Sequence, residues 1–436
     1  MKSTSAAATP VLTQAPIPEP RVGGFERGRV SFFARHWDLD PGLTFLNHGS
    51  YGAVPRVVAE EQARLRSRVE RDPVRFYKAD LEPLMDGMRG AVGRFVNCPP
   101  GTIAPMVNAT VAIATILHQT AWREGDEVLV TDHEYMSGLN ELSRLGASRG
   151  VRTVTAHVPF PGPSAGDVLA SLERAITPRT RMMMVSWITS ATSLVFPIRE
   201  VVALGRSRGI TVLVDGTHAP GQVPVDIAGM DPDYFVGSFH KWVSAPKGTG
   251  FLYVPERLQE GFRTICLSSR AHKVRPERAL FLRDSDYMGT DDYTAILSVP
   301  SAVRFFEEVM PGGWPAVMAH NHDLVLKGRE IVLDALETPE PAPATMIGTM
   351  ATVVLPEAPA SLAGRPTVYD DPIQDALVER HGCVAPVWRF MPSSGPHAGR
   401  GLRVLRLSAQ VYNTLDDYHR MASALSEELD RERRGG

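Results

Sequence analysis

Short apolar runs alternate along this chain with longer amphipathic stretches. The short runs are bounded by glycine, proline and polar residues, which is typical of buried strands. Such strands are predicted at Glu127–Asp132, Arg149–Val154, Arg181–Trp187, Thr211–Val214, Tyr234–Phe239 and Gly250–Val254. Helices are predicted at Arg56–Arg71, Val111–Thr120, Asp167–Ile176 and Ile198–Arg208. Strands that alternate with helices predict a parallel sheet with right-handed crossovers, and therefore an α/β fold.

Polar side chains follow two of these strands. Asp215 ends the strand predicted to begin at residue 211, and His218 lies in the loop behind it. Ser238, His240 and Lys241 lie at the end of the next strand. Because residues just past the carboxyl ends of parallel strands face the ligand crevice, we expect these five side chains to converge on one pocket.

This set of side chains fits pyridoxal 5'-phosphate (PLP). The coenzyme requires a lysine for its aldehyde, a carboxylate that keeps its ring nitrogen protonated, and donors for its phosphate. The chain has six lysines, at positions 2, 78, 241, 247, 273 and 327, against forty arginines. Arginine stays charged in proteins, whereas a buried lysine can lose its proton. A lysine that follows a strand and a histidine in such an arginine-rich chain therefore indicates a need for an amine that can be deprotonated. Lys241 is that candidate, and Lys247 is interpreted as a solvated turn residue.

The spacing Asp-x-x-His…Ser-x-His-Lys resembles the core of the class V aminotransferases, PLP enzymes of fold type I. The segments DGTHAPGQ and GSFHKW are most similar to the isopenicillin N epimerase-like branch. The resemblance covers about residues 40–425. It implies a large PLP-binding domain (25–300) with a mainly parallel seven-stranded sheet, and a smaller α+β C-terminal domain (301–436). Residues 25–75 would contribute to the small domain and the active-site entry.

The resemblance also implies cofactor contacts. Lys241 would bind the coenzyme, Asp215 would face its ring nitrogen, and His218 would lie beside its ring hydroxyl. Tyr135 is predicted to stack on the ring, with His133 as the second choice. The remaining contacts are assigned to Ser190, Ser238, His240 and the phosphate seat at Ala109 and Thr110, where backbone amides open a predicted helix.

A loop with the sequence YMGTDDY resembles one that family dimers lend to the neighbouring subunit's phosphate. Gly289 and Thr290 carry that resemblance, which implies a homodimer with shared active sites. Trp187 stands where the family usually has a histidine, and either fills core space or reshapes the substrate pocket.

The resemblance implies that the substrate is a small molecule, an amino acid. RLSAQVYN resembles a family signature whose arginine pairs with the substrate α-carboxylate, a role suited to a planar guanidinium. We assign it to Arg406 and expect Arg403, on the opposite face of the same strand, to be solvated. Asn47 and His48, in the entry segment FLNHGSYGAVP, are candidate substrate neighbours.

Composition narrows the class of protein. A net charge of −3 argues against nucleic acid or an anionic membrane as the main partner, and no apolar run is long enough to span a bilayer. Residues 1–24 lack a continuous apolar core and predict a flexible leader on a cytoplasmic protein. The three cysteines form neither a disulfide framework nor a metal pair, and Cys383 is interpreted as a small buried thiol.

Several reactions fit this site. A C–S β-lyase of a cysteine S-conjugate needs only Lys241 as acid and base, and the Arg-, Ala- and Pro-rich composition favours specialised metabolism in a high-GC bacterium. Epimerisation requires a second proton carrier, for which His48 and Tyr135 are candidates. Transamination, decarboxylation-linked oxidative deamination and a non-catalytic binding module are the alternatives. The joint presence of Lys241, Asp215 and Arg406 disfavours the binding module.

Overall fold

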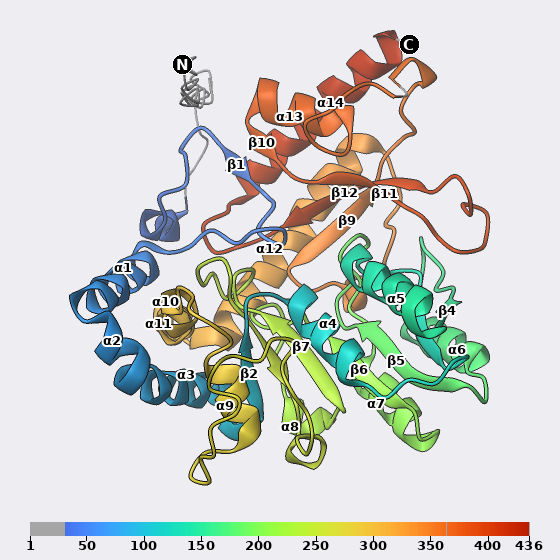
Figure 1. The fold of residues 1–436 in the computed structure, drawn as a ribbon. Helices are drawn as coiled ribbons and strands as arrows, with labels where there is room; N and C mark the ends of the chain where they lie inside the picture. The colour runs from blue at the N-terminus through green and yellow to red at the C-terminus, as the bar shows by residue number, and fades with distance from the viewer. Residues whose placement is uncertain (1–30, 363, 436) are drawn as a thin grey trace, which may run out of the picture.

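The computed structural model describes residues 31–362 and 364–435, so the predicted leader lies outside the described residues. Its largest element is a seven-stranded sheet (Figure 1). The α/β fold and the mainly parallel sheet predicted from the sequence are confirmed, because in this sheet β8 runs opposite to the other six strands. In spatial order the strands are β2 (Ile103–Met106), β8 (Gly250–Tyr253), β7 (Tyr234–Ser238), β6 (Thr211–Asp215), β5 (Thr180–Ser186), β3 (Glu127–Thr131) and β4 (Arg152–Ala156).

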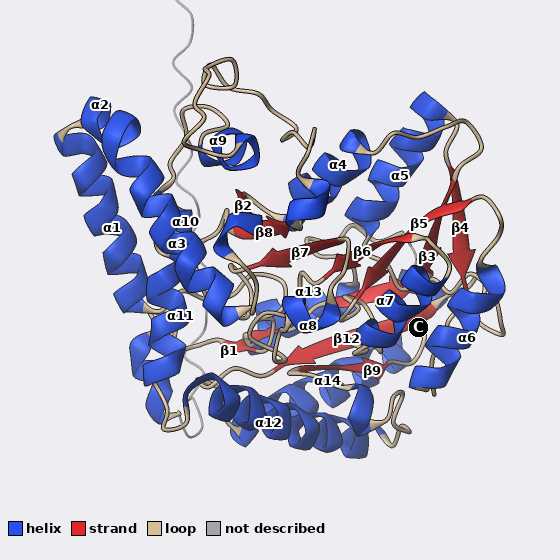
Figure 2. Ribbon diagram, turned by 90° about the horizontal axis from the view of Figure 1, so that it is seen from below, coloured by secondary structure: helices blue, strands red, loops and turns tan. Residues whose placement is uncertain are grey.

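Both faces of this sheet are covered by helices (Figure 2). Met182 and Met184 of β5 pack into the core beneath α4 (Ala109–Gln119) and α5 (Met136–Arg149). Met183 and Val185 point to the other core, beneath α6 (Ala165–Ala175), α7 (Ile198–Ser207) and α8 (Ile227–Met230). A strand buried on both faces is apolar at nearly every position, which explains the continuous apolar runs in the sequence.

A second, smaller sheet lies beside the carboxyl ends of the large one (Figure 1). It is antiparallel, in the order β11 (Val387–Phe390), β12 (Leu402–Ser408) and β9 (Met350–Val354). The accompanying helices are α12 (Gly313–Leu336), α13 (Pro372–His381) and α14 (Leu415–Gly435). The early strand β1 (Thr44–Phe45) pairs with β10 (Cys383–Val384), so the entry segment joins the C-terminal part of the chain. The domain boundary near residue 300 stays a prediction.

The remaining helices connect these sheets along one side of the molecule. They are α1 (Arg56–Arg71), α2 (Pro73–Arg75), α3 (Leu81–Phe95), α9 (Leu280–Asp286), α10 (Thr294–Leu297) and α11 (Val299–Glu308). Within the described residues, no helix is both long and apolar enough to cross a membrane.

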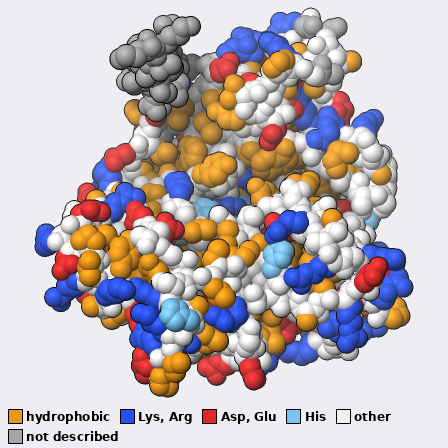
Figure 3. Space-filling model, viewed as in Figure 1, with side chains coloured by type: hydrophobic (Ala, Val, Ile, Leu, Met, Phe, Trp, Pro, Cys, Tyr) orange, Lys and Arg blue, Asp and Glu red, His pale blue; other side chains and the backbone are white. Residues whose placement is uncertain are grey.

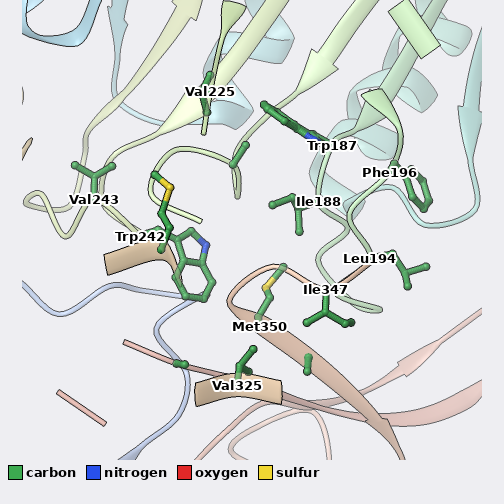
Figure 4. Packing of buried hydrophobic residues seen from close by; sticks show 14 of the residues in the cluster. Trp187, Ile188, Leu194, Phe196, Val225, Trp242, Val243, Val325, Ile347 and Met350 are labelled. Carbon is green, nitrogen blue, oxygen red and sulfur yellow. The ribbon is translucent and has the colours of Figure 1, made fainter. Parts of the chain in front are cut away.

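Trp187 fills core space. It follows β5, and its ring packs edge-on against Phe235 of β7, with the ring centroids 6.3 Å apart. Figure 4 shows it among buried hydrophobic residues that run from the large sheet towards Met350 of the small one. Of the two roles considered for this residue, the structure supports packing.

Arg403 is buried, and the expectation that it would be solvated is wrong. Only 1% of the side chain is exposed. Its guanidinium pairs with Asp371, which caps α13, and with Glu432 of α14, to which it donates at 2.8 and 2.9 Å. Because charges are rarely buried unless paired, this network is what permits an arginine on an inward face of β12.

Replacing Arg403 with alanine is expected to lower the free energy of unfolding by about 3–5 kcal/mol, because it leaves two carboxylates close together without a cation. Denaturant titration of the variant and of the parent would measure this. Arg433→Ala, an exposed arginine on α14 with a single ion pair, is the matched control and should change stability by less than about 1 kcal/mol. Equal losses in the two variants would contradict the network's role.

Candidate active site

A cavity of about 570 Å³ lies between the large sheet and the small one. That volume suits a coenzyme with a small substrate. The large sheet contributes Asp215, Ser238 and Lys241 from the ends of β6 and β7, and the small sheet contributes Trp388 and Arg406. Figure 3 shows a hollow on this side of the molecule, in which hydrophobic and basic side chains gather.

Lys241 is held at the end of β7 beside a neutral histidine. Its Nζ lies 3.1 Å from Nε2 of His218, and the Nε1–H of Trp242 donates to Nδ1 of the same ring at 3.2 Å. Since Nδ1 accepts, the proton of the neutral ring resides on Nε2 and is directed at the lysine nitrogen. Burial lowers the pKa of His218 well below 6.5, so the ring stays uncharged. Because the Nε2–H of the neutral His218 can donate a hydrogen bond only to an unprotonated nitrogen, this 3.1 Å contact favours the free amine of Lys241 over its ammonium form.

The amine itself is easily deprotonated. Burial first, and the nearby Arg406 second, lower the pKa of Lys241 from 10.5 to about 7. A lysine enclosed with another cation loses its proton more readily, because both effects penalise the charged form. The site therefore presents a nucleophilic amine at neutral pH.

The rate at which the cofactor-free protein captures PLP covalently should rise about tenfold per pH unit below pH 7 and then become constant. The reason is that only the deprotonated amine of Lys241 attacks the aldehyde, and its pKa is about 7. Stopped-flow absorbance between pH 5.5 and 9.5 would measure the rate. A rate that keeps rising to pH 9.5 would indicate an ordinary lysine instead.

Asp215 faces the cavity from the end of β6. Its carboxylate accepts the backbone N–H of Thr217 at 3.0 Å, and only 8% of the residue is exposed. Among the described residues it makes no ion pair within 4.0 Å, so its charge is available to a bound cationic ring.

Glu134 is a buried acid that sequence reasoning missed. Its carboxylate accepts from Ser186 N at 2.9 Å, Ser186 Oγ at 2.6 Å and Thr131 Oγ1 at 2.7 Å. Burial raises the pKa of Glu134 to about 7, with Asp215 adding to the effect. The contacts tie the loop that carries Tyr135 to the strand beside Asp215. The only sequence signal was its place next to the predicted stacking residue.

Arg406 forms the opposite wall. One guanidinium nitrogen donates to Ser190 O at 2.9 Å and Ser190 Oγ at 3.2 Å, and another donates to Ser50 Oγ at 2.7 Å. Its carbon lies 4.7 Å from the ring centroid of Trp388, a contact that the sequence did not reveal. Burial lowers the pKa of Arg406 to about 10. All these partners are neutral, and no carboxylate among the described residues pairs with it, so a carboxylate substrate would find a cation ready to bind it.

The residues present fit the phosphate of PLP. Asn108 caps α4, accepting from Val111 N at 2.9 Å, and the amides of Ala109 and Thr110 open the helix toward the cavity. Across the cavity, the hydroxyls of Ser238 and Thr217 are buried without any partner. Buried hydroxyls without a partner are costly unless an acceptor occupies the cavity that they line, and the phosphate of PLP could supply one.

The cavity also includes Asn47, Ser190, Tyr135 and His240, four further residues singled out from the sequence. The Tyr135 ring centroid lies 6.0 Å from the Lys241 nitrogen. His133, the second choice for stacking, is 2% exposed and bonded to Thr192 at 2.7 Å, away from the cavity.

His48 does not line the cavity, so the sequence-based expectation that it neighbours substrate is corrected. It is fully buried, with Nδ1 2.7 Å from Tyr412 Oη and Nε2 2.9 Å from the backbone oxygen of Lys241. Gly52 packs so closely on that backbone that a Cβ there would lie 2.2 Å from the same oxygen. The imidazole therefore supports the Lys241 loop from behind.

Gly289 and Thr290 lie in a separate hollow of about 200 Å³, next to Met106 and Gly248. Within one chain they do not reach the main cavity. Cys383 is buried, and burial raises the pKa of its thiol to about 11, which leaves it unreactive at neutral pH.

Three comparisons place this geometry among known proteins. The sequence profile described as "Aminotransferase class-V" matches residues 47–420. A probable chloroplastic L-cysteine desulfhydrase of Arabidopsis thaliana is 29% identical, over 91% of this chain and 84% of its own. The isopenicillin N epimerase of Streptomyces clavuligerus is 29% identical, over 89% of this chain and 95% of its own. A structure of a C-DES mutant with glycine covalently linked to its PLP cofactor superposes with a TM-score of 0.74 at 19% identity, covering 88% of this chain and 96% of that one.

Proposed function

Because the chain belongs to the class V aminotransferase family, a PLP-dependent family of enzymes that act on amino acids, we propose that it is a C–S β-lyase of a cysteine S-conjugate. The net reaction converts the conjugate and water into a thiol, pyruvate and ammonium. While the equal similarity to an isopenicillin N epimerase supports the epimerase alternative, the proposal is supported by the similarity to a probable L-cysteine desulfhydrase. It is supported further by the arrangement of proton carriers in the cavity.

The cofactor would be held by residues from three directions. Lys241 would bind its aldehyde, Asp215 would face its ring nitrogen, and Tyr135 would cover the ring. The chemistry that bound PLP would supply is electron withdrawal from the substrate's Cα, which makes the Cα proton more acidic. Further contacts are proposed for Ala109, Thr110, Ser190, His218, Ser238 and His240.

The chain's own residues divide the remaining work. Arg406 binds the α-carboxylate and thereby orients the Cα–H bond. Lys241, whose pKa is about 7, takes the Cα proton as a free amine and can return it to the departing sulfur. His218 stays neutral and keeps a hydrogen bond available to that amine. Asn47 lines the same wall as Arg406 and is proposed to contact the substrate.

The observation that carries this choice of reaction is the enclosure of His48. An epimerase needs a second proton carrier on the opposite face of Cα. His48 and Tyr135 are the two candidates from the sequence, but both ring nitrogens of His48 are occupied and it has no access to the cavity. Burial also lowers its pKa to about 3. Tyr135 is the carrier that the epimerase alternative retains.

The test is incubation with S-ethyl-L-cysteine in heavy water, followed by chiral chromatography and mass spectrometry. Ethanethiol with pyruvate is the expected result. Deuterium at Cα with the thioether intact and the configuration inverted would overturn the lyase in favour of an epimerase, and Tyr135→Phe should then abolish inversion. A keto acid that retains the thioether would favour transamination, and loss of CO₂ would favour the decarboxylating alternative. A colourless protein that transforms nothing would favour a non-catalytic binding module.

We also propose that the protein is a cytoplasmic homodimer that serves bacterial specialised metabolism, and that its two active sites are each shared between the subunits. Gly289 and Thr290 would contact the phosphate of the PLP bound in the other subunit. This would explain why their loop, which resembles a phosphate-binding loop, lies outside the main cavity of its own chain. Light scattering of the purified protein tests the dimer. A Thr290→Val variant with weakened PLP affinity would support sharing, and a monomer with full PLP affinity would overturn it.

A further inference from the structure

One wall of the cavity is formed by the segment Val368–Asp370, which precedes α13. No part of this segment entered the cofactor or α-carboxylate assignments. It lines the same cavity as Arg406 and Trp388, together with Gln374. A bound amino acid whose carboxylate meets Arg406 therefore has this wall available for its side chain.

The backbone of this wall is held at several points. The amides of Val368 and Tyr369 donate to Asp375 at 2.8 and 2.9 Å. The next residue after the segment, Asp371, pairs with the buried Arg403 and accepts from Ile373 N at 2.9 Å. The contacts of Asp371 and Asp375 thus hold the backbone of this cavity wall in place. Its side chains are therefore presented to the cavity in a defined order.

Asp370 is the exception in this network. Its neighbours Asp371 and Asp375 are both engaged, whereas the side chain of Asp370 is exposed at the cavity and, among the described residues, makes no hydrogen bond and no ion pair within 4.0 Å. Arg406 and Lys241, the cavity's two basic chains, lie beyond that distance. A carboxylate on a cavity wall that the protein leaves unpaired is free to pair with a ligand.

Aromatic side chains line the same cavity as the Asp370 carboxylate. Tyr369 is 40% exposed and Tyr51 is 70% exposed, and both line the cavity. Trp388 lies on the same lining, with one face toward Arg406 and an indole N–H that is buried without a partner. Aromatic faces beside a carboxylate attract organic cations, including ammonium groups that a hydrocarbon pocket would reject.

We propose that Asp370 is a specificity-determining residue, and that the S-substituent of the substrate carries a positive charge. This inference rests on the proposed lyase function, because it names the side-chain class at the same site. Arg406 takes the α-carboxylate at one end of the substrate. Asp370, with Tyr369 and Tyr51, takes a cationic group at the other.

The test is a matched substrate series that differs only in terminal charge: S-(2-aminoethyl)-, S-(2-hydroxyethyl)- and S-(2-carboxyethyl)-L-cysteine. For each, kcat/KM is measured from thiol release, and Cα proton exchange in heavy water is measured separately. The parent enzyme is expected to favour the aminoethyl over the hydroxyethyl compound by about tenfold. Asp370→Asn should bring that ratio close to one, Asp370→Glu should retain it, and Asp370→Lys should reverse it toward the carboxyethyl compound. Asp334→Asn is the control, because Asp334 is an exposed residue on α12 and its substitution changes the net charge by the same amount as Asp370→Asn.

A parent ratio near one, or a ratio that Asp370→Asn leaves unchanged, would overturn the inference. Failure of the lyase proposal can be distinguished from failure of this inference. If no thiol is released, the exchange rates across the series still report recognition, and a cation preference that depends on Asp370 in exchange alone would uphold this inference while the lyase fails. Equal exchange across the series would overturn the inference whether or not thiol is released.

Discussion

Replacing Lys241 with alanine should lower kcat by at least about 10³-fold and abolish covalent attachment of PLP. In the proposed mechanism the side chain supplies both the amine that binds the aldehyde and the base that reaches Cα, and its amine lies 3.1 Å from Nε2 of His218. Turnover of S-ethyl-L-cysteine measures the first effect. Borohydride reduction followed by peptide mass spectrometry measures the second, since reduction fixes PLP to the lysine that binds it.

Lys327→Ala is the matched control. Lys327 is an exposed lysine on α12 that pairs with Asp323, four residues away. Its loss should leave both turnover and attachment unchanged. Attachment of PLP to another peptide in the parent protein would refute the assignment of Lys241, whatever the kinetics show.

Replacing Arg406 with alanine should raise KM by about 100-fold or more, because it removes the buried cation that we propose binds the α-carboxylate. Lysine at this position should restore only part of the affinity, since an ammonium cannot reproduce two parallel hydrogen bonds. Steady-state kinetics with the acid and with its carboxamide analogue would measure the contribution. The parent should discriminate strongly between these two compounds, and Arg406→Ala should discriminate little.

Arg208→Lys, an exposed arginine with one partner on α6, controls for a general effect of changing arginine. Unfolding curves for the Arg406 variants are also needed, because Arg406 bridges Ser190 and Ser50 from different parts of the chain. If kcat falls while the discrimination between acid and carboxamide survives, Arg406 organises the site and another group binds the carboxylate.

Much of the cavity was accessible from local patterns. Asp215 and Lys241 end strands in the sequence, and strand ends in a parallel sheet meet at one edge by geometry alone. The phosphate seat proposed at Ala109 and Thr110 came from the family resemblance, and the structure shows a capping asparagine, Asn108, at that helix start. Arg406 was identified by its signature, and the structure brings it to the cavity across nearly two hundred residues from Asp215 because β12 packs above the sheet's carboxyl edge.

Burial and pairing were not accessible in this way. Arg403 and Arg406 lie three residues apart on one strand, and nothing local distinguishes a solvated arginine from one buried against Asp371 and Glu432. His48 stands in an entry loop beside Asn47, yet only the packing of Gly52 and Tyr412 turns its ring away from the cavity. Glu134 and Trp388 do not belong to any spaced sequence motif that would have marked them as residues of the site.

By itself, then, the sequence determined the order of the strands along the chain and placed Asp215 and Lys241 at strand ends, because these depend on neighbours within a few positions, and its resemblance to the family predicted the PLP chemistry. The tertiary structure decided which charges are paired, which imidazole reaches the cavity, and that the carboxylate of Asp370 lines the cavity without a partner among the described residues. Those properties depend on contacts between segments far apart in the chain, and a local pattern carries no record of the partner that each side chain will meet.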